Sequence, residues 1–279
     1  MAGYENRLIL FIDFLGFQEH VDRTVAEASF LDRLVEALAH LREVGMEQEV
    51  FPSQQMTHFS DSVVLSFRIE ERSAVFWMLT QIRLAIIRLA GNGFLVRGAV
   101  TVGPLFHTPE ALVGPAMVTA YHMESRVAVY PRVIIDPTII QVAREHRSTI
   151  HHADEEERYV RGGVSMAADG QLWIDYISYK SYLNAGADPD GYPSYLERLG
   201  RLIRTGLLHV SVDVARKFVW LQPYYSSQIG LFAGLKVQDH PEAEAQRLFV
   251  AGLPALATDM ADALARIQAA DGVTQLSLQ

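Results

Sequence analysis

The first half of the chain alternates hydrophobic runs of strand type with longer segments of helical period, in an order that few folds accept. Strand-like runs cover residues 8–14, 94–102 and 132–136, a hairpin pattern covers 56–67, and helical spacing covers 21–44, 72–90 and 114–129. Hairpins mixed with helices are typical of an α+β sandwich rather than of a doubly wound parallel sheet. The sequence therefore predicts an α+β fold with an antiparallel-rich sheet and helices.

The second half of the chain has a different pattern. The pattern changes after residue 137, residues 144–163 are polar and charged, and from Tyr192 onward the apolar residues recur mainly at helical spacing. We therefore expect two parts. The first is a domain at residues 1–136, and the second is a mixed, mainly helical C-terminal extension at residues 137–279 that packs on it.

The composition limits the kinds of site, partner and location. The 279 residues include no cysteine, which excludes disulfides, cysteine–zinc sites and thiol nucleophiles. The net charge of -9 argues against a nucleic-acid partner but allows a local pocket for a small anion. The sequence has neither a secretory signal pattern nor an uninterrupted apolar stretch of membrane-spanning length. We expect a soluble cytoplasmic protein with no membrane partner.

A single acid interrupts the first strand. The run LILFIDFLGF places Asp13 among apolar residues, and Asp61 lies at the turn of the predicted hairpin. A buried carboxylate is costly unless it is paired or binds a metal ion, and two carboxylates in one place suit Mg²⁺ or Mn²⁺. The alternative is that Asp13 caps the following helix and Asp61 is only a turn residue. The spacing alone leaves both interpretations open.

Four motifs in order resemble the catalytic domain of the class III nucleotidyl cyclases. The motifs FIDFLGF, HFSDSVVLSF, VRGAVTVGPLFH and VGPAMVTAYHMES span about residues 7–136. The resemblance implies that Asp13 and Asp61 hold two divalent ions, Mn²⁺ or Mg²⁺, and that the backbone carbonyl of Phe14 reaches a metal. It also implies that the ribose 3′-hydroxyl of a nucleoside triphosphate attacks the α-phosphorus and expels pyrophosphate.

Four positions depart from the purine-specific members of that family. Thr57 and Ala111 stand where the purine-reading residues are expected. Val118 and His122 stand where the family has an Asn and an Arg that orient the ribose and stabilise charge. The resemblance therefore assigns Thr57 to nucleotide binding and argues against a purine substrate.

The lost positive charge has candidate replacements nearby. Arg97 lies on a strand that should border the site, and we assign it to nucleotide binding and catalysis. His122 is the second catalytic candidate, and Arg132 is a further candidate cation. Each has a structural alternative: an ion pair for Arg97, a helix-surface or core position for His122, and a surface position for Arg132.

One subgroup of the family shares the loss of the purine readers. With RGAVTVG, AYHMES, YPR and KFVWLQPYY, the chain is similar to the pyrimidine cyclases of bacterial Pycsar anti-phage systems. The resemblance implies a homodimer with sites at the subunit interface, a Mn²⁺ preference, and a downstream effector protein that the cyclic nucleotide activates. It favours a uridylate cyclase that converts UTP to 3′,5′-cyclic UMP.

Three other functions stay open at this point. The Thr57 hydroxyl both donates and accepts hydrogen bonds, so it suits uracil and cytosine equally, and a cytidylate cyclase is the first alternative. A cyclase that uses ATP is the second, although Thr57 and Ala111 speak against it. A non-catalytic nucleotide-binding regulator is the third, because the Asn and Arg of the family are absent.

Overall fold

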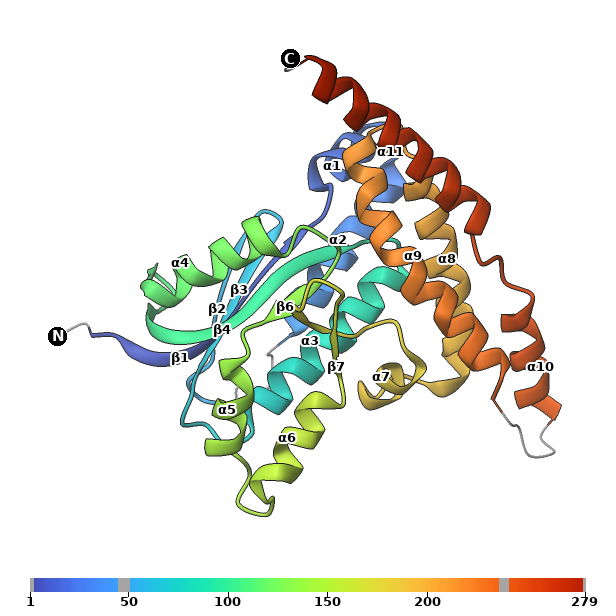
Figure 1. Cartoon of the computed structure of the whole chain (residues 1–279). Helices are drawn as coiled ribbons and strands as arrows, with labels where there is room; N and C mark the ends of the chain where they lie inside the picture. Colours follow the sequence, from blue (N-terminus) through green and yellow to red (C-terminus); the bar gives the residue numbers. More distant parts are fainter. Residues whose placement is uncertain (1–2, 45–50, 236–240, 278–279) are drawn as a thin grey trace. The chain divides into compact units, whose positions relative to one another are not determined.

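The computed structural model describes residues 3–44, 51–235 and 241–277 (Figure 1). The strands are β1 Glu5–Phe14, β2 Gln55–Phe59, β3 Ser62–Arg68, β4 Val96–His107, β5 Leu112–Val113, β6 Val133–Ile135, β7 Val164–Met166 and β8 Leu172–Ile174. The helices are α1 Phe17–Ala26, α2 Ala28–Glu43, α3 Ala74–Gly91, α4 Pro115–His122, the π-helix η1 Met123–Val127, α5 Thr138–Glu145, α6 Ala153–Arg161, α7 Tyr179–Asn184, the 3₁₀-helix η2 Pro189–Gly191, α8 Tyr192–Leu207, α9 Val212–Ala233, α10 Pro241–Ala251 and α11 Ala257–Ser277.

The chain forms two compact units, and the sheet belongs to the first. This unit comprises Met1–Tyr176 and Asn184–Gly186. Its strands follow the order β2-β3-β1-β4-β6-β8-β7, with β5 paired to β4. Among the described pairs only β4 and β6 run parallel. The predicted α+β fold with an antiparallel-rich sheet and helices is confirmed.

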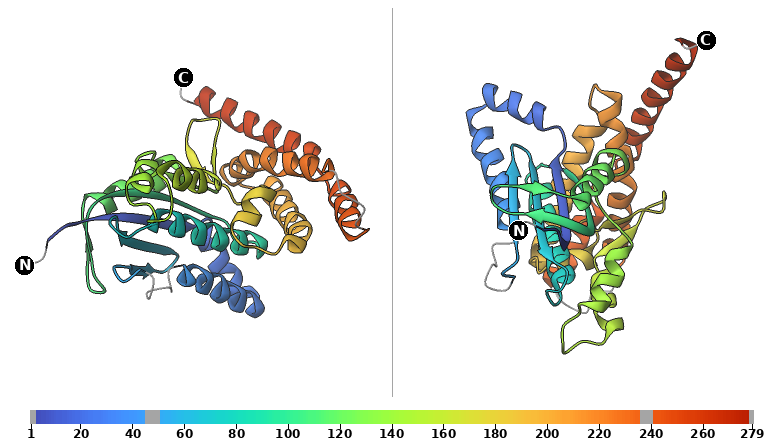
Figure 2. Two further views of the ribbon diagram at one scale, coloured as in Figure 1. Left: turned by 90° about the horizontal axis from the view of Figure 1, so that it is seen from below. Right: turned by 90° about the vertical axis from the view of Figure 1, so that its left-hand side faces the viewer.

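The central strand β1 sends alternate side chains to the two faces of the sheet. Leu8, Leu10 and Ile12 point to one face, and Ile9 and Phe11 to the other, and all five are buried. Figures 1 and 2 show α2 and α3 on one face of the sheet and α4 on the other. The short helix α4 packs against β1 and β4. Both faces of β1 are therefore covered, as its almost continuous apolar sequence requires.

Helix α3 is the one helix in the described ranges that is long and apolar enough to cross a membrane by length and composition. In the fold, 61% of it is buried. This burial is that of a core helix, and it explains the high hydrophobicity without a bilayer. The cytoplasmic location remains an expectation.

The first unit extends beyond the predicted boundary at residue 136. Strand β8 pairs with β6, with Trp173 opposite Ile134, and β7 pairs with β8. The side chains of Trp173 and Ile174 are buried, and the unit continues to Tyr176. The boundary predicted from the sequence lies before the polar segment at residues 144–163, but strand pairing carries the sheet past that segment.

The second unit comprises Ile177–Leu183 and Ala187–Gln279, and its described residues are helical. Helices α8, α10 and α11 all pack against α9. Glycine allows the closest of these approaches, because a Cβ atom at Gly206 would lie 2.0 Å from the ring of Phe218. The predicted helical character of the C-terminal extension is confirmed. Its packing on the first domain stays a prediction.

Candidate functional site

Asp13 lies near the end of β1, where three strands meet. Its register partners are Ser62 on β3 and Arg97 on β4. The Ser62 hydroxyl donates a hydrogen bond of 2.8 Å to Asp13 Oδ1, and Arg97 Nη2 lies 3.7 Å from Asp13 Oδ2. The Asp13 side chain is 17% exposed, so one edge of the carboxylate is open to a ligand.

Asp61 reaches the same place from the turn between β2 and β3. Ser60 in this turn has a positive φ of 47°, which permits the tight reversal. The backbone N–H of Phe14 donates to the Asp61 carbonyl oxygen at 3.3 Å, so the turn is tied to the end of β1. The predicted proximity of Asp13 and Asp61 follows from this hairpin, while their role as metal ligands stays a prediction.

The two aspartates influence each other electrostatically. Burial raises the pKa of the Asp13 carboxyl, and the negative charge of Asp61 raises it further, against opposing contributions from Ser62 and Arg97. The ionised form of Asp13 is therefore disfavoured by its surroundings. A dication placed between the two carboxylates would reverse this effect.

Arg97 joins the aspartates to a third acid. Arg97 Nε forms an ion pair with Glu124 Oε1, and the Glu124 side chain is only 2% exposed. Burial raises the pKa of Glu124, and the negative charges of Asp13 and Asp61 add to this, while Arg97 opposes it. Glu124 lies in the π-helix η1, a helix type that often occurs at functional sites. The motif AYHMES contains this residue, but the sequence did not single it out from its neighbours.

His122 lies on the outer face of α4. Ala116 and Ala120 turn toward the sheet, whereas Val118, Tyr121 and His122 are exposed. Within the residues that the structure describes, His122 makes no polar contact with the two aspartates or with Arg97. The predicted catalytic role of His122 therefore requires a ligand or a second chain to meet it there.

Arg132 forms a buried ion pair with Asp169, so its charge supports the fold rather than the site. Its side chain is fully buried, and its guanidinium holds both carboxylate oxygens of Asp169, at 2.9 Å and 2.5 Å. The turn between β7 and β8 provides Asp169. The candidate cation of the sequence is thus neither a surface residue nor a free ligand group, because its charge is already paired.

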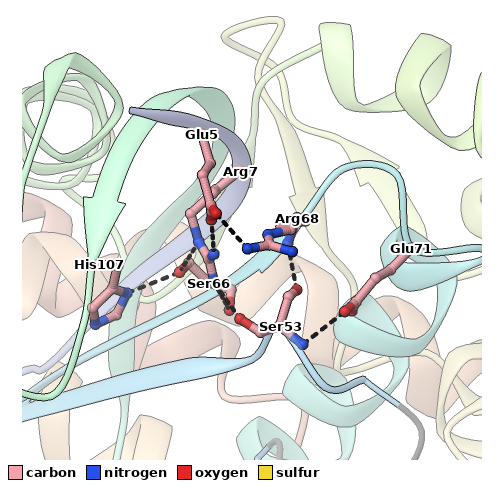
Figure 3. A network of polar contacts seen from close by, with 7 residues as sticks. All are labelled: Glu5, Arg7, Ser53, Ser66, Arg68, Glu71 and His107. Atoms are coloured by element: carbon pink, nitrogen blue, oxygen red, sulfur yellow. Dashed lines mark hydrogen bonds and ion pairs between the residues drawn. The ribbon is translucent and has the colours of Figure 1, made fainter. Parts of the chain in front are cut away.

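Thr57 belongs to a polar network on the same face of the sheet as Asp13. Thr57 Oγ1 lies 2.8 Å from His107 Nε2, and Ser66 Oγ lies 2.8 Å from His107 Nδ1. Arg7 Nε donates to Ser66 Oγ at 2.9 Å. Figure 3 shows Arg7, Ser66 and His107 together with the charged residues around them. Burial lowers the pKa of His107 to about 4, and the positive charge of Arg7 adds to the effect.

This pKa predicts a loss of stability in acid. The pKa of His107 is 6.5 in the unfolded chain and about 4 in the folded protein, so the unfolded chain takes up a proton first as the pH falls. Stability is then lost between these two values, by about 3 kcal/mol in total. Urea unfolding at several pH values should show a smaller acid loss in His107→Gln than in the native protein. Equal losses in both proteins would contradict the assignment.

The described residues include no group of three or more His, Asp or Glu side chains arranged to hold a metal ion. Metal binding at Asp13 and Asp61 would therefore need further oxygen ligands from the backbone, from water or from a substrate. Such a donor set suits Mg²⁺ and Mn²⁺, which retain several non-protein ligands.

Comparison with known proteins returns distant structural neighbours. No protein-family model matches the sequence, and no curated protein matches it. Among solved structures, a bacterial light-regulated adenylyl cyclase aligns over 57% of each chain, with 12% identity and a TM-score of 0.39. The adenylyl cyclase CyaB from P. aeruginosa aligns over 61% of this chain and 93% of its own, with 11% identity and a TM-score of 0.41. The guanylyl cyclase Cya2 aligns over 62% of this chain and 93% of its own, with 10% identity and a TM-score of 0.37.

These neighbours are all nucleotide cyclases, but the similarity is low. The alignment with the first of them spans 57% of that protein's length. Identity and TM-score are both too low for the likeness to assign a family or a function. The chemistry of the site must carry the assignment.

Proposed function

We propose that the protein is a metal-dependent nucleotide cyclase that acts on a pyrimidine nucleoside triphosphate, with UTP favoured. The observation that carries the proposal is the meeting of Asp13 and Asp61 at one end of the sheet, where burial and mutual repulsion raise the pKa of Asp13. Such a pair of carboxylates destabilises the protein when no cation is bound, and a bound cation offsets this cost. The motifs around these residues resemble those of class III cyclases.

The residues present fit one or two divalent cations of the Mg²⁺ and Mn²⁺ type. Asp13 and Asp61 would supply carboxylate oxygens, and the carbonyl of Phe14 is a further oxygen ligand in reach of the same end of β1. When bound, the metal supplies charge neutralisation of the triphosphate and lowers the pKa of the attacking ribose hydroxyl.

The remaining residues of the site orient these groups. Ser62 fixes Asp13 Oδ1 by donating its hydroxyl hydrogen, and Asp13 Oδ2, which lies 3.7 Å from Arg97 Nη2, would be shared between Arg97 and a ligand. Arg97 lies between Asp13 and Glu124 and provides a positive charge beside the position of the phosphates. Glu124 holds Arg97 in place, so that Arg97 does not simply neutralise Asp13.

A homodimer is part of the proposal. Val118, Tyr121 and His122 are exposed on α4, and Val118 and His122 stand at the positions where the resembled family has the Asn and Arg of its site. A second copy of the chain that covers this face would bring His122 to a nucleotide. A cytoplasmic anti-phage role, with a cyclic-UMP-activated effector downstream, rests on the resemblance to the Pycsar cyclases.

Two alternatives keep specific support. A cytidylate cyclase needs the same site and differs only at the base. A non-catalytic nucleotide-binding regulator is supported by the exposed Val118, which stands in place of a polar residue, and by the ion pair that engages Arg97.

The test is the identity of the product. Purified protein with Mn²⁺ is incubated separately with ATP, GTP, CTP and UTP, and the products are identified by mass spectrometry. We expect 3′,5′-cyclic UMP and pyrophosphate from UTP. Cyclic CMP alone would establish the first alternative, and nucleotide binding without pyrophosphate release would establish the regulator. Cyclic AMP or cyclic GMP alone would contradict the assignment of Thr57.

A further inference from the structure

Four side chains from four strands form a continuous series of hydrogen bonds that ends at Thr57, which we call the relay. Arg7 on β1 contacts Ser66 on β3 at 2.9 Å, and Ser66 contacts His107 on β4 at 2.8 Å. His107 then contacts Thr57 on the edge strand β2 at 2.8 Å. Figure 3 shows the part of the relay that runs from Arg7 through Ser66 to His107. The direction of each hydrogen bond follows from the chemistry of the groups.

The first two directions are fixed by Arg7. A guanidinium only donates, so Ser66 Oγ accepts from Arg7 Nε. Ser66 is fully buried, and in the described part of the chain its hydroxyl has no side-chain partner besides Arg7 and His107. Its own hydrogen must therefore go to His107 Nδ1, because the opposite direction would leave a buried O–H without an acceptor.

The third direction follows at His107. The ring is 6% exposed and lies near the positive charge of Arg7, and both effects keep it neutral at physiological pH. A neutral imidazole carries one hydrogen, and with Nδ1 accepting, this hydrogen is on Nε2. His107 therefore donates to Thr57 Oγ1. The hydroxyl hydrogen of Thr57 has no acceptor among the described residues and is left for a ligand.

Thr57 stands in line with the metal end of the site. Its register partner is Val64, and the partner of Val64 on β1 is Phe11, two residues before Asp13. Side chains at these positions share one face of the sheet. Thr57 is only half-buried and lies on the edge strand β2, so a base can approach it from solvent while the phosphates lie at Asp13.

We propose that His107 is a positioning residue that holds Thr57 as a hydrogen-bond donor to the 4-carbonyl of the base, and so selects uracil over cytosine. This inference rests on the proposed function and deepens it by naming the base. Uracil carries a carbonyl oxygen at position 4, which accepts, whereas cytosine carries an amino group, which donates. A cytosine amino group could meet Thr57 only at the remaining lone pair of Oγ1, which would leave the Thr57 hydroxyl hydrogen without an acceptor, and this cost gives the discrimination.

Paired variants test the inference at each end of the relay. Thr57→Val removes the hydroxyl with little change of shape, and Thr57→Ser keeps it. We measure kcat/KM for UTP and CTP with Mn²⁺, and the affinity for both nucleotides by calorimetry. Thr57→Val should reduce the preference for UTP by about ten-fold, and Thr57→Ser should retain it. His107→Gln, whose amide nitrogen lies near the position of Nε2, should keep more of the preference than His107→Asn.

An activity-independent measurement decides the direction of the relay. ¹⁵N NMR of the histidine side chains, with His107 assigned by comparison with His107→Gln, should show a neutral ring with its hydrogen on Nε2. A hydrogen on Nδ1, or a charged ring at neutral pH, would overturn the relay whatever the enzyme does.

The outcomes for the relay and for the function are separable. Turnover of UTP with an unchanged preference in Thr57→Val, or a native preference for CTP, overturns the inference and leaves the cyclase intact. Absence of both turnover and binding for every nucleotide overturns the proposed function, and the uracil assignment fails with it. The NMR result then still decides the hydrogen-bond direction.

Discussion

Replacing Asp13 with asparagine is expected to abolish the proposed cyclase activity and to stabilise the metal-free protein. The carboxylate is disfavoured by burial and by the charge of Asp61, so the neutral amide removes an unfavourable interaction. The amide oxygen can still accept the hydrogen bond from Ser62. Activity should fall by more than about 100-fold, because the loss of groups that merely support metal ligands already costs 10- to 100-fold.

Thermal unfolding with and without Mn²⁺ checks both parts. Mn²⁺ should raise the unfolding temperature of the native protein. Without metal, Asp13→Asn should unfold at a higher temperature than the native protein, and Mn²⁺ should not raise that temperature further. Ser62→Ala is the matched control, because it removes the hydrogen bond but keeps the carboxylate, and it should retain part of the metal effect. Asp61→Asn should likewise lose the gain of stability from Mn²⁺. Full activity in both aspartate variants would exclude a metal role for these residues.

Replacing Gly98 with alanine is expected to give a large loss of stability in the first unit. A Cβ atom at Gly98 would lie 2.5 Å from the carbonyl oxygen of Phe11 and 3.1 Å from the Cα of Ile12. Both are backbone atoms of β1, so β4 would have to separate from the central strand. We expect a loss of more than about 4 kcal/mol or a failure to fold. Few single substitutions have so large an effect, and those that do act through strain or overpacking of this kind.

Gly230→Ala is the matched control for this prediction. A Cβ atom at Gly230, inside α9, meets nothing within 4 Å. The same chemical change should there stabilise the helix by up to about 1 kcal/mol. Urea unfolding followed by circular dichroism measures both variants. A native-like unfolding curve for Gly98→Ala would show that β1 and β4 approach less closely than described.

The sequence predicted the half of the fold in which the hydrophobic period is strong. The strand around Asp13 and the hairpin around Asp61 appear as expected, because continuous apolar runs and a polar turn leave few other choices. The order of these elements then brings the two aspartates together. The elements after residue 137 were harder to predict, because helix α6 is polar and lacks a clear apolar period. Its main local signal is the N-terminal cap, in which Glu155 accepts from the backbone N–H of His152.

The partners of the site depend on features with no local signal. In AYHMES the π-helix η1 changes the spacing after α4, so the regular helical period does not tell whether His122 or Glu124 faces inward. The relay to Thr57 joins residues that are 41 to 59 positions apart. It also depends on the last residue of β4, His107, which no local pattern places beside Ser66 and Thr57.

The central position of β1 has a consequence for how the chain folds during synthesis. Glu5–Phe14 is made before both of its neighbours in the sheet, Ser62–Arg68 and Val96–His107. Such long-range pairing slows folding, because the intervening chain must close before any contact is gained. Until residue 107 has left the ribosome, the apolar segment Leu8–Ile12 lacks one of its two strand partners. The nascent protein therefore carries an apolar strand with an incompletely paired edge while residues 15–107 are made, and its yield in a cell should depend on chaperone supply.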